Sequence, residues 1–403
     1  MSDEAQYPVD RMLVPYLESL RARLGGSLEL VDVHTHIGAN DPDGFAQTPA
    51  ELIAQLDAID AHGVTFPMHE PEGYPTANDT AIDAAAASGG TLRAFCRVDP
   101  RSEKTDPVAE AERCLDRGAV GIKLHPRAEQ FTLGEPAVER LFALAGERRL
   151  PILVHAGRGI PALGRDSLRL TEAHPGARLI LAHGGISDLA WLHELVEPGS
   201  NLFFDTAWWS PSDLQALFAL VPPGQILMAS DAPYGTPAFA ATMAIRHGLQ
   251  VGLAPDAIRG VLGAQARRLA EREDPFDLGP APGIESLSRD PLLERVYSFL
   301  LSAIGQMFAG VDPKETLALA ALACDVGERD EHAPLYAAIM ALLDARANYD
   351  PTGDGRPSRF APGLHLIIVA AALARTPDVP LPDEPLSFQN EGPGSDRKRV
   401  TRN

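Results

Sequence analysis

Histidine and aspartate residues stand at the ends of several apolar runs in this sequence. His34 and His36 close the run LELVDVHTH, and His155, His183 and Asp231 each follow a later run. Side chains alternate along a β-strand, so two histidines two residues apart point the same way and can reach one ion. An aspartate that follows the run ILMAS is costly to bury unless a cation or a donor compensates its charge. The set therefore predicts a metal site.

Three imidazoles and one carboxylate are the expected ligands. Zn2+ prefers such groups, and manganese and iron compete for them. We expect one divalent metal, with zinc favoured over manganese or iron, bound by His34, His36, His155 and Asp231. If the ion takes five ligands, the site leaves room for a water molecule whose pKa the metal lowers towards about 7. Asp231 is then placed to take the proton of that water.

His183 has two alternative roles. It either completes a second metal site or stays outside the first ion as an acid, a base or a transition-state donor, and we favour the second role. A binuclear site would need a bridging anion, which a carboxylated Lys123 in GIKLHP could provide. The alternative for Lys123 is an interior or phosphate-binding cation. We therefore do not expect a second metal.

Three further side chains near the same strand ends are candidates for substrate binding. Arg158 follows the run PILVHAG and could bind a substrate carboxylate, or it could form a salt bridge at the rim instead. His125 is placed either to contact the substrate or to support the metal ligands. Trp208, with Trp209 beside it, could wall a pocket or plug the space against more distal helices.

Eight apolar runs alternate with helical patterns and must position these side chains. A short helix is expected at 15–24, and the segment 48–63 is a helix with Thr48 as its N-cap. Eight buried strands spaced by crossover helices predict an α/β fold, a closed (β/α)8 TIM barrel with its functional face at the C-terminal strand ends. The predicted strands are 28–36, 64–70, 91–100, 119–126, 151–157, 177–185, 201–209 and 224–235.

The other histidines receive no role, although His69 also ends a predicted strand. The remaining six are expected on helices or at helix ends, where they face no common site: His62, His174, His193, His247, His332 and His365.

The sequence changes character after the eighth strand. A linker rich in Pro and Gly is placed at 276–287, so that the barrel domain spans 1–275. A C-terminal all-helical appendage is predicted over 288–375, and a disordered tail over 376–403. The apolar helix faces must pack on each other, on the barrel or on a second subunit, so a homodimer is one option. The four expected helices are 290–310, 312–327, 333–347 and 362–375.

Composition limits the partners of this chain. Its 403 residues carry 35 Lys and Arg against 55 Asp and Glu, a net charge of −20 that repels nucleic acid and anionic membranes. A small-molecule substrate is therefore expected. The cysteines Cys96, Cys114 and Cys324 are odd in number and far apart, and the N-terminus lacks signal-peptide features, so we expect a cytoplasmic protein.

The ordered set VDVHTHIG, GIKLHP, PILVHAG, LILAHGG, NLFFDTAWW and ILMASDAPYG resembles the signature of the amidohydrolase superfamily, specifically its amidohydrolase-2 branch. The resemblance runs from about Leu28 to Leu269, and the helices after Ser286 match nothing in it. It implies that His34, His36, His155 and Asp231 bind a single metal and that His183 is the catalytic histidine. The branch includes hydrolases of C–O and C–N bonds and also non-oxidative decarboxylases.

Three functions are compatible with these residues. The first is hydrolysis of an ester, lactone or amide bond of a small molecule by a metal-activated water, with proton transfer by Asp231 and His183. The alternative is a metal-dependent decarboxylase of an aromatic or unsaturated acid, whose ligands would be the same. A weaker alternative is an inactive barrel that serves as a binding scaffold.

Overall fold

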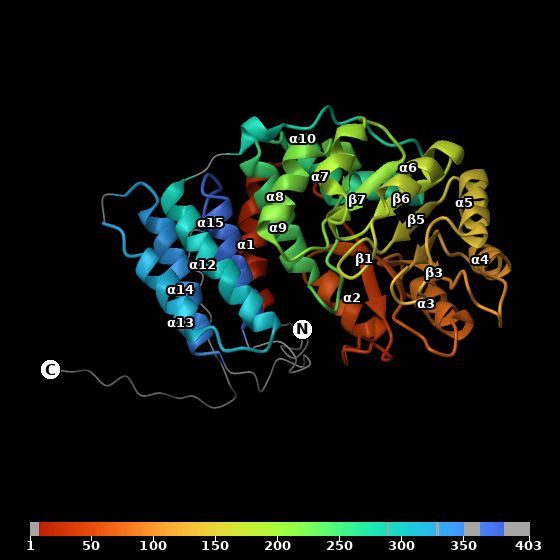
Figure 1. Ribbon diagram of the computed structural model, residues 1–403, viewed down its shortest axis with the longest axis horizontal. Helices are drawn as coiled ribbons and strands as arrows, with labels where there is room; N and C mark the ends of the chain where they lie inside the picture. Colours follow the sequence, from red (N-terminus) through yellow and green to blue (C-terminus); the bar gives the residue numbers. More distant parts are fainter. Residues whose placement is uncertain (1–7, 288–289, 328–329, 350–362, 383–403) are drawn as a thin grey trace.

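Eight parallel strands form the centre of the molecule. The computed structural model describes residues 8–287, 290–327, 330–349 and 363–382 (Figure 1). Each strand pairs with the next in chain order, which is the order of a barrel. The strands are β1 (Leu30–Ile37), β2 (Ala61–Pro67), β3 (Leu92–Arg97), β4 (Gly121–Leu124), β5 (Pro151–Val154), β6 (Arg178–Leu181), β7 (Leu202–Asp205) and β8 (Ile226–Leu227).

Backbone hydrogen bonds between the first and last strands close the ring. The Val33 amide donates to the Met228 carbonyl over 3.1 Å, and farther along the Asp231 amide donates to the His34 carbonyl over 2.8 Å. Inside the ring, large apolar side chains such as Phe66 and Phe203 are fully buried. The fold is therefore the predicted TIM barrel, and its closure places Asp231 directly beside His34.

Crossover helices surround the barrel, and most of them begin with proline at the first position, where no intrahelical donor is lost. Side chains of Asp106, Ser210 and Thr236 accept hydrogen bonds from the first turns of their helices. The helices are α2 (Pro49–Asp57), α3 (Pro75–Ala87), α4 (Pro107–Asp116), α5 (Pro136–Arg148), α6 (Gly164–Ala173), α7 (Leu189–Leu192), α8 (Pro211–Leu220), α9 (Pro237–Gln250), α10 (Pro255–Arg259) and α11 (Gln265–Ala270).

The second strand begins earlier than predicted. Thr48 caps α2 as expected, but the helix ends at Asp57 rather than near residue 63. Asp60 turns the chain with a φ of +49°, and Gly63 pairs with Leu92 in the sheet. A Cβ on Gly63 would lie 2.8 Å from a methyl carbon of Leu56, so this glycine allows helix and strand to approach. His62 therefore lies in β2, and its placement on a helix was wrong.

Among the residues that the structure describes, four helices follow the barrel, and a longer helix than predicted precedes it. α1 (Pro8–Leu24) contacts α9, while α15 (Leu364–Arg375) contacts α8, α12 and α14. Figure 1 shows this helical region on the side of the barrel that carries α8 and α9. The other three helices are α12 (Pro291–Phe308), α13 (Lys314–Ala323) and α14 (Ala333–Ala347).

Residues 376–382 differ from the expected disordered tail. Thr376 is fully buried and receives the Arg246 guanidinium, whose Nη2 donates to the Thr376 carbonyl over 2.7 Å. The Tyr16 hydroxyl donates to the carbonyl of Pro380 over 2.9 Å. These contacts attach the segment to α1 and α9, and the rest of the predicted tail, 383–403, lies outside the described residues.

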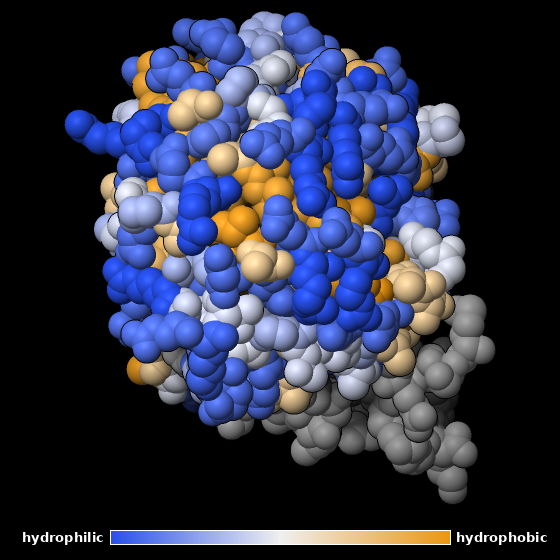
Figure 2. Space-filling view, turned by 90° about the vertical axis from the view of Figure 1, so that its right-hand side faces the viewer, coloured by the Kyte–Doolittle hydropathy of each residue, from blue (hydrophilic) through white to orange (hydrophobic). Residues whose placement is uncertain are grey.

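The surface is mainly hydrophilic on the face shown in Figure 2, where hydrophobic residues gather near the middle. Among the described residues, no helix has the length and apolar character needed to cross a membrane.

Candidate metal centre

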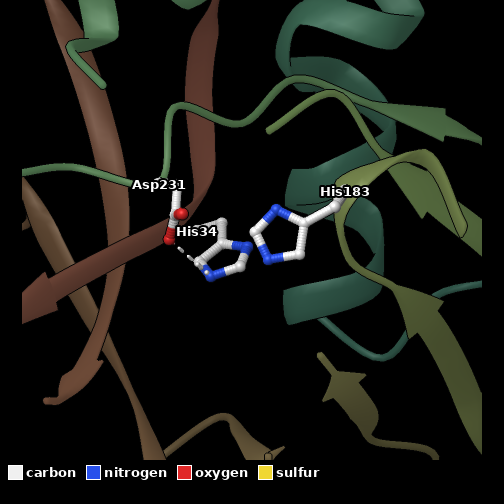
Figure 3. A group of neighbouring side chains, drawn as sticks. All are labelled: His34, His183 and Asp231. Atoms are coloured by element: carbon white, nitrogen blue, oxygen red, sulfur yellow. Dashed lines mark ion pairs between the residues drawn. The ribbon is translucent and has the colours of Figure 1, made fainter. Parts of the chain in front are cut away.

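Three groups from the first and last strands of the barrel meet at its mouth. The His36 Nε2 atom lies 3.2 Å from His34 Nε2 and 3.1 Å from the Asp231 Oδ1 atom. His34 Nε2 lies 3.1 Å from the same carboxylate oxygen. Figure 3 shows Asp231 and His183 on opposite sides of His34, with both side chains turned toward it.

An irregularity in β1 directs the two histidines into the mouth. Val31 and Val33 belong to the apolar interior of the barrel. The pairing of β1 with β2 shifts between Asp32 and Thr35. Such a bulge redirects the side chains that follow it. His34 and His36, which keep the predicted spacing of two, therefore point toward Asp231.

Two of the site residues adopt an unusual backbone conformation. His183, in the short helical turn η1 (His183–Gly185), has a φ of +58°, and Asp231 has a φ of +59°. Residues other than glycine rarely adopt this left-handed region, and such strain persists only where the surroundings hold it. In both places the sharp turn just after a strand brings the side chain back over the barrel mouth.

Asp205 at the end of β7 holds two of the histidines in place. Its Oδ2 atom lies 2.7 Å from His34 Nδ1, and its Oδ1 atom accepts the backbone N–H of His183 over 2.7 Å. The carboxylate thereby fixes the ring of His34 so that Nε2 faces the site, as metal-binding histidines require. Asp205 was not among the predicted site residues, although an aspartate after the apolar run NLFF is the same signal that identified Asp231.

His155 and His183 form a second pair across the mouth. His183 Nδ1 lies 2.6 Å from the carbonyl of Ala207 and must donate to it, so His183 Nε2 carries the lone pair. That Nε2 atom lies 3.0 Å from His155 Nδ1. A Cβ on Gly157 would lie 2.7 Å from the His183 ring, so the glycine of the HAG motif makes room for both imidazoles.

The His155 ring stacks on His125, with ring centroids 3.9 Å apart, and its Nε2 atom is buried. No described residue forms a hydrogen bond with that atom. A buried polar atom without a partner costs free energy, so an external ligand would stabilise it.

The donor set fits a divalent cation. The lone pairs of several nitrogen and oxygen atoms point toward the same place. Their mutual repulsion can be relieved by protons or by a bound cation. Among the described residues, the atoms of His34, His183 and Asp231 lie within 4.8 Å of one another and could hold an ion. His36 lies within 3.2 Å of two of them, whereas His155 approaches this group through His183.

Burial and neighbouring charges shift the pKa values in the site. Burial lowers the pKa of His36 to about 3, against the opposing effect of Asp231. Burial alone would raise the pKa of Asp231, but His34 and His36 outweigh it and hold that pKa well below its usual range. Burial and Lys123 would lower the pKa of His34, but Asp231 and Asp205 outweigh them and raise it. His36 is therefore neutral and Asp231 anionic, as ligands must be, whereas a cation would have to displace a proton from His34.

Lys123 is a buried cation that lies beside the predicted metal ligands. Its ammonium nitrogen is fully buried, 3.4 Å from His34 Nε2 and 4.7 Å from the centre of the Phe66 ring. Burial lowers its pKa to about 7, an effect that Asp231 partly opposes. The expectation that Lys123 does not form a carboxylated bridge to a second metal stays a prediction.

A cavity of about 680 Å³ opens from this cluster. The three predicted substrate-binding residues, His125, Arg158 and Trp208, all line it. Arg158 is exposed, and its guanidinium carbon lies 6.0 Å from the centre of the Phe308 ring. Trp209 also lines the cavity and lies 4.9 Å from Phe308, ring centre to ring centre, so the tryptophan pair both walls the pocket and packs on the helical region.

Two other residues of the cavity were missed or given no role. Tyr234 lines it, donates to Asp41 over 2.5 Å, and lies 5.8 Å from the His36 ring. Tyr234 belongs to the motif SDAPYG, three residues after Asp231. This position near the end of the last strand could have identified it as a site residue. His365 on α15, which received no role, is also part of the cavity wall.

Comparison with solved structures finds similar barrels at low identity. 5-Carboxyvanillate decarboxylase from Sphingomonas paucimobilis is 16% identical, with a TM-score of 0.48 over 61% of this chain and 99% of that one. 2,6-Dihydroxybenzoate decarboxylase from Rhizobium is 16% identical, with a TM-score of 0.47 over 61% and 99%. 4-Oxalomesaconate hydratase from Rhodopseudomonas palustris is 17% identical, with a TM-score of 0.44 over 60% and 96%.

Comparison of sequences gives a more specific result. No protein of curated function matches this chain. The sequence model described as Amidohydrolase, of the amidohydrolase-2 type, matches residues 31–269, which is more than half of the 403 residues. That stretch contains every residue of the candidate metal centre and all eight strands except the first residue of β1. The chain belongs to the amidohydrolase-2 family, whose members are enzymes that act on small molecules.

Proposed function

We propose that this protein is a metal-dependent hydrolase of an ester, lactone or amide bond in a small molecule. The observation that supports it best is the meeting of His34, His36 and Asp231 at distances of 3.1 to 3.2 Å in the mouth of the barrel. The cluster lies inside the stretch that matches the family.

We assign one zinc ion to His34, His36, His155 and Asp231. The unpartnered Nε2 of His155 supports its inclusion, and its chain neighbour Gly157 leaves the ring room to turn. A bound ion would polarise the substrate carbonyl and lower the pKa of a water molecule. His183 could compete for the same place, because its Nε2 faces the cluster.

The chain's own residues would then move the protons. The Asp231 carboxylate is placed to take a proton from the attacking water, since its Oδ1 atom lies at the centre of the cluster. His183 Nε2 carries a lone pair, because Nδ1 donates to the Ala207 carbonyl, and is placed to receive the proton from Asp231 and pass it to the leaving oxygen or nitrogen. Asp205 keeps both His34 and His183 in position without contacting the substrate.

Three residues would bind the rest of the substrate near the cluster. Arg158 is placed to bind a carboxylate, because no described acidic side chain forms an ion pair with it. His125 and Trp208 provide flat surfaces on either side of the imidazole pair. These surfaces would orient the reacting bond toward the cluster.

Metal content and product analysis test this proposal. The purified protein is expected to contain about one transition metal ion per chain, and a chelator should abolish activity that zinc restores. Incubation with a panel of lactones, esters and amides should release acid without carbon dioxide. Protein without stoichiometric metal, and without activity after metal addition, would instead indicate a binding scaffold.

A decarboxylase is the second candidate. An aromatic acid could place its ring against Trp208 and its carboxylate near Arg158, both of which line the cavity. The metal ligands would be the same, so the products must distinguish the two reactions. Release of carbon dioxide from hydroxy-aromatic acids, with no turnover of lactones or esters, would replace the hydrolase assignment.

A further inference from the structure

The cavity continues beyond the metal centre into a space between the barrel and the helical region. Its wall there is formed by Phe218 of α8, Ala240 and Ala244 of α9, and Leu366 and Ile368 of α15. All five side chains are buried and apolar. We call this part of the cavity the apolar compartment.

Helix α15 is what encloses this compartment. Its sequence, LHLIIVAAALAR, is apolar on nearly every face, and it packs against α8 of the barrel as well as α12 and α14. Its C-terminal end is attached to the barrel, because the Gln215 side chain donates to the Arg375 carbonyl over 3.0 Å. Arg246 binds the next residue, Thr376, in the same way. The wall is therefore fixed in position.

Small side chains keep the space open. Ala240 and Ala244 lie one turn apart on α9, and both face the cavity. Apart from His365 on α15, the wall here is hydrocarbon and offers little to bind a polar ligand, which would lose its hydration without compensation. An apolar chain loses nothing and gains roughly 0.8 kcal/mol per buried CH2 group, a fourfold change in affinity.

The compartment and the metal centre belong to one continuous cavity of about 680 Å³, within the usual range for sites that enclose an entire small ligand. We propose that the substrate is an amphiphile, whose alkyl or acyl chain occupies the apolar compartment while its reacting bond lies at the metal centre. The position of the reacting bond rests on the proposed function, whereas the binding of the chain does not.

Binding of straight-chain carboxylates tests the proposal without turnover. Calorimetric titration of the full-length, metal-loaded protein with hexanoate, octanoate, decanoate and dodecanoate should show affinity rising about fourfold per CH2 group until the compartment is full. The heat-capacity change of binding should become more negative with chain length. Equal affinity for all four probes would overturn the proposal.

Filling the compartment gives the second test. Ala240→Leu and Ala244→Leu should weaken decanoate binding at least tenfold while leaving hexanoate binding within about twofold. The matched control is Ala216→Leu, the same change on α8 at a half-buried position that is not part of the cavity wall. Thermal unfolding of each variant separates a filled cavity from a misfolded protein. Unchanged decanoate binding in both folded filling variants would contradict the proposal.

Failure of the inference and failure of the proposed function give different results. Chain-length-dependent binding without any metal-dependent turnover would retain the compartment and remove the hydrolase. Turnover of short lactones or esters, together with carboxylate affinity that does not depend on chain length, would retain the hydrolase and exclude chain binding in the compartment. If both hold, kcat/KM for a series of acyl esters should follow the binding series, and Ala240→Leu should shift the preference to shorter chains.

Discussion

The two ends of the cavity are built in different ways. At the metal centre, each side chain lies at the end of a barrel strand or just after it and is held by hydrogen bonds, such as those that Asp205 accepts from His34 and His183. At the apolar compartment, the wall comes from helices far apart in the chain and is held mainly by packing, with hydrogen bonds from Gln215 and Arg246 at the C-terminal end of α15. The first end has a geometry that chemistry requires, and the second needs only shape and hydrophobicity. We therefore expect substitutions at the first end to remove activity and those at the second to change its target.

The largest effect is expected for Asp231→Asn. The amide keeps the shape of the side chain but loses the charge that binds a cation and the basicity that takes a proton. We expect kcat/KM to fall about 10² to 10⁴-fold, with weaker metal retention. Steady-state kinetics and metal analysis measure both. Activity within tenfold of the parent would remove Asp231 from the chemistry.

The histidine pair separates metal binding from proton transfer. His155→Ala should lower metal affinity by orders of magnitude, whereas His183→Ala should retain the metal and lose about 10² to 10⁴-fold in kcat. Metal titration with a competing chelator, followed by kinetics at saturating zinc, distinguishes the two variants. Equal metal loss in both would show that the two residues share the ion, as the approach of His183 to His34 and Asp231 allows.

Asp205→Asn tests whether Asp205 positions the His34 ring, since we do not expect Asp205 to contact the substrate. The variant should reduce metal affinity about 10- to 100-fold, because the ring of His34 loses the acceptor that orients it. Excess zinc should restore much of the activity, which it cannot do for Asp231→Asn. A variant with normal metal affinity would show that the backbone alone positions His34.

Phe308→Ala is expected to have the smallest effect. Phe308 lies between Trp209 and Arg158 at the edge of the helical region. Removing its ring should raise KM severalfold and leave kcat and metal content nearly unchanged, the pattern of lost uniform binding. Full kinetics on the best substrate of the panel would measure this. A fall in kcat as large as that of His183→Ala would instead show that the helical region contributes to catalysis.

The barrel and most of its polar centre could be predicted because they follow local rules. A period of two in β1 placed His34 and His36 together, and the count of strands gave the ring that brings Asp231 beside them. The roles within that centre were predicted but stay untested, since His155 and His183 both reach the cluster. Asp205 was missed because only Trp208 and Trp209 were considered at the end of the seventh strand.

The apolar end could not be predicted from the sequence. Its wall depends on how α15 packs on α8, a contact between residues about 150 positions apart that no periodic pattern encodes. The attachment of Thr376 was invisible for the same reason, because a Pro-rich segment with polar neighbours has the composition of a tail. Helix α2 ended early because Gly63 packs on Leu56, which is also a matter of tertiary contact.

The hydrogen bonds of Asp205 have a consequence for how the protein is made. His34 leaves the ribosome 171 residues before the carboxylate that orients it, and the three strands that Asp205 joins are β1, β6 and β7. A nascent chain that ends before β7 therefore contains several of the histidines but not the arrangement that they need. Capture of the ion is then a late event in biogenesis, tied to completion of the ring, and early fragments should have little tendency to scavenge metal.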